Sequence, residues 1–201
     1  TPTPDLARRL DDPGMSEAAT RLVGGADGTF DVLQIEGLEM ARHGLAAVAG
    51  SRGGRPRPIY DAHNAEWVLQ HRAWQTDRGR PRLWHGALYS LVQTAKLRRF
   101  ERQLLSAVHA TVAVSARDAD ALRAVAPHAT VAVVPNGVDT AAFTPSDAAL
   151  VEPRLAVFTG KMDFRPNIDA MTWFAGKVWP LVRALRGDAR LAIVGRDPAA
   201  R

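Results

Sequence analysis

Residues 131–139 read VAVVPNGVD, a short apolar run that ends in proline, asparagine and glycine. The apolar run predicts a buried strand. The Pro-Asn-Gly triplet predicts a tight turn, because proline fixes φ and the two residues after it tolerate positive φ. Residues 139–153 lack periodicity and contain two prolines, which predicts a linker. We therefore expect one α/β domain in residues 1–138 and a second in residues 154–201.

Strand-like and helix-like patterns alternate on both sides of this linker. The expected strands are 30–37, 57–64, 111–115 and 130–137, then 154–160 and 190–195. The expected helices are 38–50 with a glycine stop at Gly50, 84–108, 116–125 and 166–185. Such alternation predicts α/β domains with parallel sheets and right-handed crossovers. Two strands and one helix cannot bury their own faces, so the second domain looks incomplete.

The longest expected helix, 84–108, has apolar residues at three- to five-residue steps. We expect its buried face to consist of Trp84, Leu88, Leu91, Ala95, Phe100, Leu104 and Val108. The segment 72–102 is also basic, with eight Lys or Arg against two acidic residues. Such a charge permits anionic partners such as nucleotides, nucleic acid or phospholipid surfaces, and an ordinary packed helix with core aromatics fits the same residues.

Composition excludes several classes of protein. The chain is 46% hydrophobic and 23% charged, and it has no run long enough for a membrane helix and no signal-peptide pattern at residues 1–12. We expect a cytoplasmic protein. The absence of cysteine excludes disulfides, thiolate catalysis and Cys-ligated zinc, and the six histidines form no metal pattern. The net charge of +5 permits anionic partners.

Ligands of parallel sheets bind beyond the carboxyl ends of the strands. In TGKMDFRPNID, Gly160 follows a strand and Lys161 and Arg165 add charge, where a helix starts near Pro166 or Asn167. A diphosphate suits a glycine, two cations and a helix amino end. A plain strand-to-helix turn with two solvated cations fits the same residues.

Two further segments follow strands of the first domain. In DAHNAEW, His63 can bond a sugar hydroxyl or a phosphate, and Asn64 is a candidate helix N-cap. A loop histidine satisfied by the backbone fits equally well, and Glu66 reads as surface charge. Glu36 and Glu39 follow the first strand.

ARDAD contains Asp118 and Asp120 at the start of a helix. We interpret both as surface carboxylates that stabilise the helix dipole, not as a metal motif.

These segments together resemble a known family. VPNGVDTAAF, FTGKMDFRPNIDAMTWF and LAIVG, preceded by FDVLQIEGLEM, YDAHNAEW and KLRRFERQLLSAVHATVAVS, are similar to the family 4 glycosyltransferases of the GT-B type. The resemblance covers about residues 30–196. It implies two Rossmann-like domains, and a metal-independent, retaining transfer of a sugar from a nucleotide-sugar in the cleft between them.

The resemblance also assigns roles to residues. His63 matches the histidine that contacts the donor sugar near the reacting carbon. Gly160 and Lys161 match the positions that face the donor diphosphate, with Arg165 as an offset second cation. The remaining assignments are Asn136 and Gly137 on the donor side, and Glu36, Glu39 and Asn64 on the acceptor side.

The resemblance implies a nucleotide-sugar donor, a glycan or lipid-linked acceptor, and no cofactor, metal or nucleic acid. The pathway would be cell-envelope or exopolysaccharide synthesis, with possible contact with the inner face of the cytoplasmic membrane. The family's acidic pair would lie beyond Arg201 and its glycine-rich loop before Thr1, so we expect a fragment that lacks both ends and is inactive alone. A nucleotide-sugar epimerase and a basic nucleic-acid-binding module remain as alternatives.

Overall fold

The computed structural model describes residues 2–24, 30–49, 56–145, 147 and 150–198. The chain divides into two compact units, Thr1–Gly137 and Val138–Arg201. Each unit has its own sheet, and each is described here by itself.

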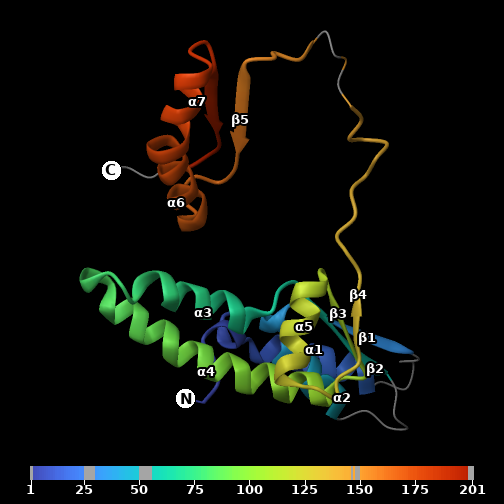
Figure 1. Ribbon diagram of the computed structural model, residues 1–201. Coiled ribbons are helices and arrows are strands. Elements are labelled where there is room, and N and C mark those ends of the chain that lie inside the picture. The colour runs from blue at the N-terminus through green and yellow to red at the C-terminus, as the bar shows by residue number, and fades with distance from the viewer. Residues whose placement is uncertain (1, 25–29, 50–55, 146, 148–149, 199–201) are drawn as a thin grey trace. The chain divides into compact units, whose positions relative to one another are not determined.

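The first unit is built on a four-stranded parallel sheet with the strand order β1-β2-β3-β4 (Figure 1). The strands are β1 (Val32–Glu36), β2 (Arg57–Ala62), β3 (Ala110–Ala113) and β4 (Val131–Val133). Every neighbouring pair is parallel. The alternating pattern of the sequence therefore predicts the sheet correctly.

Helices precede the first strand and connect the strands that follow. They are η1 (Leu6–Arg8), α1 (Pro13–Gly24), η2 (Leu38–Met40), α2 (Ala41–Ala49), α3 (Glu66–Asp77), η3 (Pro81–Leu83), α4 (Trp84–Ala107) and α5 (Ala116–Val125), where η denotes a 3₁₀-helix in this unit. The sequence analysis missed α1, and the glycine expected to end α2, Gly50, lies outside the described residues.

One core joins the sheet to α2, α4 and α5. Ile35 and Tyr60 from the sheet pack with Leu104 of α4 and Leu122 of α5, and all four are at most 2% exposed. Gly44 brings α2 close to β1, because a β-carbon added there would lie 2.5 Å from Cγ1 of Ile35. This packing fixes the level at which the carboxyl ends of β1 and β2 open to solvent.

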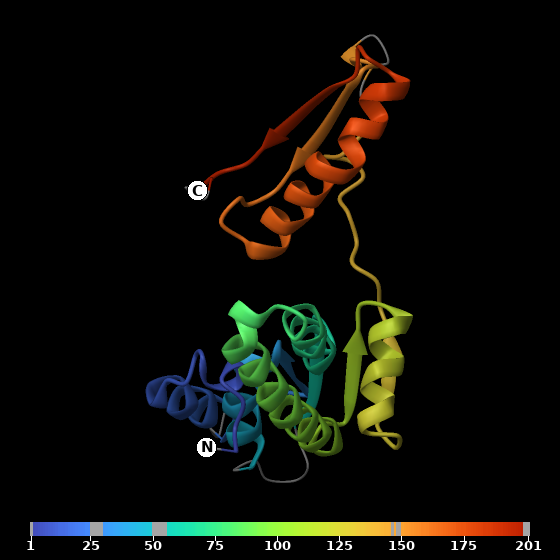
Figure 2. The same ribbon diagram turned by 60° about the vertical axis from the view of Figure 1, so that its left-hand side comes forward.

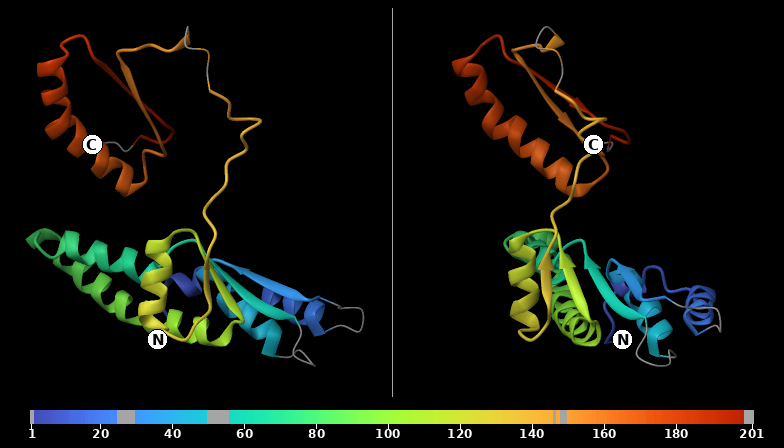
Figure 3. Two further views of the ribbon diagram at one scale, coloured as in Figure 1. Left: turned by 45° about the vertical axis from the view of Figure 1, so that its right-hand side comes forward. Right: turned by 90° about the vertical axis from the view of Figure 1, so that its right-hand side faces the viewer.

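Helices α3 and α4 lie side by side and extend beyond the sheet (Figures 1 and 3). The predicted buried face of α4 is correct only in the second half of the helix. Leu104 is buried and Phe100 and Val108 pack against the core. In the first half, Trp84, Leu88 and Leu91 are 56%, 54% and 43% exposed. The face that is buried consists of Ala87, Ser90, Gln93, Thr94, Leu97, Glu101, Leu104 and Leu105. Small and hydrogen-bonding residues on this face let α3 approach, and Nε2 of Gln70 on α3 donates to Oγ of Ser90 at 3.0 Å.

The structure of residues 131–139 differs from the one predicted from the sequence. The predicted strand is present as β4, but it lies at the edge of the sheet and Val133 is 41% exposed, so its predicted burial is wrong. The tight turn predicted at Asn136 and Gly137 is also wrong, because residues 134–139 form no turn.

The second unit is a single βαβ arrangement. The strands β5 (Leu155–Thr159) and β6 (Arg190–Val194) pair in parallel. Between them, α6 (Arg165–Trp173), the π-helix η5 (Phe174–Val178) and α7 (Trp179–Leu185) run along one side of the pair (Figure 2). None of its described residues is fully buried.

The helix predicted over 166–185 is thus present but interrupted. Pro180 lacks an amide, and its ring clashes with the carbonyl group one turn earlier, so the helix widens before it. Accordingly, the amide of Trp179 donates to the carbonyl oxygen of Phe174, five residues back.

Candidate active site

His63 lies at the carboxyl edge of the first sheet, directly after β2, and it is exposed. Gly37 ends β1 beside it with a φ of 73°, and its amide donates to the carbonyl oxygen of Asp61 at 3.0 Å. A β-carbon at Gly37 would lie 3.0 Å from Oε2 of Glu39 and 3.7 Å from Cε1 of His63. Glu39 and His63, far apart in the sequence, therefore face the same narrow space, and glycine is the residue that leaves it open.

Asn64 and Glu66 adjoin this space. The prediction that Asn64 caps α3 is wrong, because the N-cap residue is Ala65; Nδ2 of Asn64 instead approaches Oε1 of Glu66 at 3.4 Å. Burial raises the pKa of the Glu66 carboxyl above its ordinary value, the Asn64 contact opposes this, and the nearby Glu39 adds to it. Glu66 is therefore half-buried among other charged groups, not simply on the surface as expected.

Two more charged residues border this edge. Arg9 forms an ion pair with Glu39 at 3.7 Å. Glu36 accepts a hydrogen bond at 3.1 Å from Nε2 of Gln34, which also donates to Asp61. Glu39, His63, Asn64 and Glu66 thus form one group, hereafter the His63 cluster, and Glu36 belongs to a separate hydrogen-bonded group on β1 and β2.

Two carboxylates from other helices hold the backbone just after His63. Glu101 of α4 accepts from the amides of Glu66 at 2.8 Å and Trp67 at 3.3 Å, and it is fully buried. Asp118 of α5 accepts from the amide of Ala65 at 3.1 Å. The interpretation of Asp118 as a surface carboxylate is therefore wrong, since it joins α5 to the start of α3.

The sequence analysis missed Glu101 altogether. One signal could have revealed it: Glu101 stands four residues after Leu97 and three before Leu104, on the face of α4 that is buried. A carboxylate at such a position needs hydrogen-bond donors, because an unpaired buried charge is costly. The amino end of α3 supplies them.

In the second unit, Gly160 and Gly195 follow β5 and β6 and pack against each other. A β-carbon at Gly195 would overlap the carbonyl oxygen of Gly160, and one at Gly160 would lie 2.8 Å from Nδ2 of Asn167. That same Nδ2 donates to the carbonyl oxygen of Lys161 at 2.9 Å. The turn expected before the helix is present, with α6 starting at Arg165, and close packing against the backbone requires glycine at position 195.

The two cations of this turn have acidic neighbours. Nζ of Lys161 lies 2.9 Å from Oδ2 of Asp163, and Nε of Arg165 lies 3.6 Å from Oδ2 of Asp169. All four side chains are about half exposed. An arriving anion could therefore exchange places with either aspartate at small cost, since exposed ion pairs contribute little.

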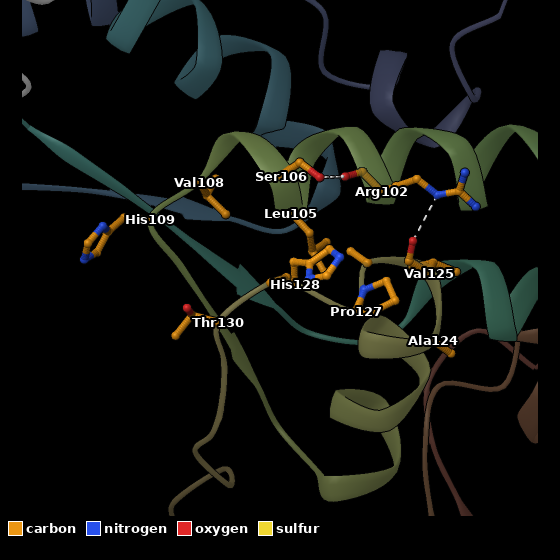
Figure 4. Close-up of a pocket in the computed structure, with 12 residues that line it drawn as sticks. Arg102, Leu105, Ser106, Val108, His109, Ala124, Val125, Pro127, His128 and Thr130 are labelled. Carbon is orange, nitrogen blue, oxygen red and sulfur yellow. Dashed lines mark hydrogen bonds between the residues drawn. The ribbon is translucent and has the colours of Figure 1, made fainter.

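A hollow of about 550 Å³ opens at the opposite, amino end of β3 and β4 (Figure 4). Leu105, Val108 and Pro127 line it together with His109 and His128. The ring of His109 points away from His128, and Arg102 bonds the carbonyl oxygen of Val125 instead of turning into the hollow. None of the predicted site residues borders it.

The described part of the chain contains no group of three or more metal-ligating side chains. None of the helices within it is long and apolar enough to cross a membrane.

The first unit is thus a Rossmann-like α/β domain, with a parallel sheet, helical crossovers and polar side chains gathered at the carboxyl edge of its strands. The chain belongs to Glycosyltransferase Family 4, whose family model matches residues 1–142. It therefore carries a domain of a glycosyltransferase, an enzyme that transfers sugars from a donor to an acceptor. A search of curated proteins finds no match.

Proposed function

We propose that this chain is part of an enzyme that transfers a sugar from a nucleotide-sugar to a glycan or lipid-linked acceptor in cell-envelope or exopolysaccharide synthesis. The observation that carries the proposal is the His63 cluster, which presents an exposed imidazole beside Glu39 at the open carboxyl edge of β1 and β2. Membership of a glycosyltransferase family supports the reaction class.

Within the His63 cluster, the roles follow from the chemistry of the side chains. The imidazole of His63 can donate to a hydroxyl of the donor sugar next to the reacting carbon. The carboxylates of Glu39 and Glu66 and the amide of Asn64 can bond acceptor hydroxyls, since sugars offer both donors and acceptors. We propose these contacts, with Glu36 at the rim, as the acceptor side of the reaction.

The second unit would take the donor diphosphate. Its departure needs stabilisation of developing negative charge, which cations can supply without a metal. Lys161 and Arg165 would exchange their aspartate partners for phosphate oxygens. The amide of Gly160 already donates to the carbonyl oxygen of Val194 at 3.0 Å, so in this proposal Gly160 shapes the turn and leaves the binding to side chains. We also propose, from the family resemblance, that Asn136 and Gly137 bind the donor.

The experiment offers UDP-, GDP- and ADP-sugars to the enzyme that contains this chain and measures release of the nucleoside diphosphate, with and without candidate acceptors. Release from one nucleotide class, reduced in His63→Ala and retained in His128→Ala, is expected. Release from no donor would contradict the proposal. Conversion of the donor into an isomeric nucleotide-sugar without acceptor would favour an epimerase.

The lipid-linked acceptor and a location at the inner face of the cytoplasmic membrane have support from α4. Trp84, Leu88 and Leu91 recur at three- to four-residue steps and are all exposed, so they form an apolar stripe along the first turns of the helix. Arg98, Arg99 and Arg102 follow along the same side and are also exposed. An apolar stripe beside cations suits the surface of an anionic membrane.

A further inference from the structure

The loop that carries His63 is fixed from both sides by hydrogen bonds to its backbone. Before His63, the carbonyl oxygen of Asp61 accepts from the amide of Gly37 at 3.0 Å, which ties β2 to the end of β1. After it, the amides of Ala65, Glu66 and Trp67 donate to carboxylates of two other helices. Ala62, His63 and Asn64 lie between the two anchor points.

The anchor after His63 is an unusual helix cap. Helices normally satisfy their first amides with a side chain from their own N-cap residue. α3 has Ala65 at that position, which offers no such side chain. Glu101 and Asp118, 35 and 53 residues away from the amides they bond, supply the acceptors instead.

Asp118 and the first turn of α3 are themselves held in place by further contacts. Asp118 is bonded by the hydroxyl of Ser115, and its own amide donates back to Ser115 Oγ at 3.1 Å. Trp67, at the start of α3, donates from Nε1 to the carbonyl oxygen of Ala121 at 3.3 Å. The guanidinium of Arg98 lies 4.9 Å above the Trp67 ring. α4 and α5 thus both hold the first turn of α3.

We propose that Glu101 and Asp118 are positioning residues that set the place of His63 for sugar transfer, acting through the backbone of residues 65–67. This inference rests on the function proposed for His63. Neither carboxylate needs to touch the substrate. A displacement of about 1 Å at a reacting group can lower the rate about 100-fold, so the rigidity of this loop bears on turnover.

The test compares Glu101→Gln and Asp118→Asn with Asp120→Asn, a matched control on α5. Asp120 is exposed and pairs with Arg123 at 3.2 Å, away from α3. Gln and Asn keep the side-chain volume and one acceptor oxygen, but an NH₂ group that cannot accept a hydrogen bond replaces the second oxygen. Three quantities are measured: kcat and KM for the donor, amide exchange of residues 65–67, and the NMR signals of the His63 ring.

We expect both variants to lower kcat about 10- to 100-fold, to change KM for the donor less than threefold, to speed exchange at residues 65–67 and to shift the His63 signals. The control should stay within twofold of the parent. If Glu101→Gln does not fold, Asp118→Asn decides.

Three contrary results are distinguishable. If His63→Ala lowers kcat strongly while Asp118→Asn and a folded Glu101→Gln keep it within twofold, the inference is overturned and the proposed function stands. If the parent turns over no donor, the proposed function is overturned. If the parent turns over a donor and His63→Ala does so at the same rate, the role of His63 is overturned, and the inference with it.

Discussion

Oε1 of Glu101 accepts a hydrogen bond from the amide of Glu66 at 2.8 Å, across 35 residues of sequence. Glu101 is fully buried, and burial raises the pKa of its carboxyl from 4.5 to about 8, although the amides of Glu66 and Trp67 oppose the shift. The nearby charge of Glu66 adds to it. The phenol of Tyr60 is buried close by, and its pKa is raised by burial and then by Glu101.

This shift makes stability depend on pH. Between pH 4.5 and about 8, the folded protein keeps a proton on Glu101 that the unfolded chain releases. The proton on Glu101 therefore contributes fully to the free energy of unfolding below pH 4.5. This contribution is lost as pH rises to 8, by at most about 1.4 kcal/mol per pH unit. Glu101→Gln should flatten the slope of unfolding free energy between pH 5 and 8, measured by urea denaturation. Asp120→Asn should leave it unchanged, and a parent slope also retained in Glu101→Gln would contradict the prediction.

His63→Ala should separate turnover from stability. The side chain is exposed, so its removal should change the free energy of unfolding by no more than about 0.5 kcal/mol. Loss of a contact at the reacting sugar should lower kcat about 100-fold or more. Thermal unfolding and nucleoside diphosphate release measure the two effects, with His128→Ala as control. A large drop in thermal stability would mean that His63 supports the fold.

Gly195→Ala should destabilise the second unit, because the new methyl group would overlap the carbonyl oxygen of Gly160. We expect a loss of about 1 to 3 kcal/mol, read from amide exchange in β5 and β6. Gly187→Ala is the control, since its β-carbon would have its nearest neighbour at 3.9 Å. Equal exchange in the two variants would argue against the close approach of the two turns.

The exposed stripe of α4 should bind anionic vesicles. Leu88→Glu with Leu91→Glu should abolish cosedimentation with phosphatidylglycerol vesicles, because the change adds charge to the stripe without touching the buried face. Leu22→Glu, at an exposed site on α1, should bind as the parent does. Added salt should weaken binding, and parent binding to neutral phosphatidylcholine alone would rule out the role of the cations.

Periodicity was enough to predict the parallel sheet, because strands and helices differ in the spacing of their apolar residues. It predicted the burial of Leu104 at the end of α4, but not which side of the first turns of that helix is buried. Trp84 and Leu88 are apolar but exposed, whereas Ser90, Gln93 and Thr94 are polar but buried. The buried side of α4 is set by contacts with α3 and with the residues before α1. Gln93, for example, accepts a hydrogen bond from the amide of Asp5 at 3.1 Å. Such long-range partners leave no local pattern.

Local sequence also predicts the residues of the candidate site, but not the long-range contacts that bring them together and hold them. A position after a strand is a local feature, and it is enough to point to His63 and Glu39. Their meeting across Gly37 depends on the parallel register of β1 and β2, in which Glu36 lies opposite Asp61. The anchors Glu101 and Asp118 lie on later helices, and a charged residue in a helix is ordinarily read as solvent-exposed.

The remote cap of α3 also bears on how the protein folds. Residues 65–67 gain their hydrogen-bond acceptors only when α4 and α5 are in place, so the turn around His63 cannot mature early in the folding of the chain. The hairpin of α3 and α4, the helix α5 and the turn that carries His63 should therefore form together, in one cooperative step. Local unfolding of the carboxyl edge of β1 and β2 should then require α3, α4 and α5 to separate. This coupling would keep the imidazole of His63 in one place while the surrounding surface fluctuates.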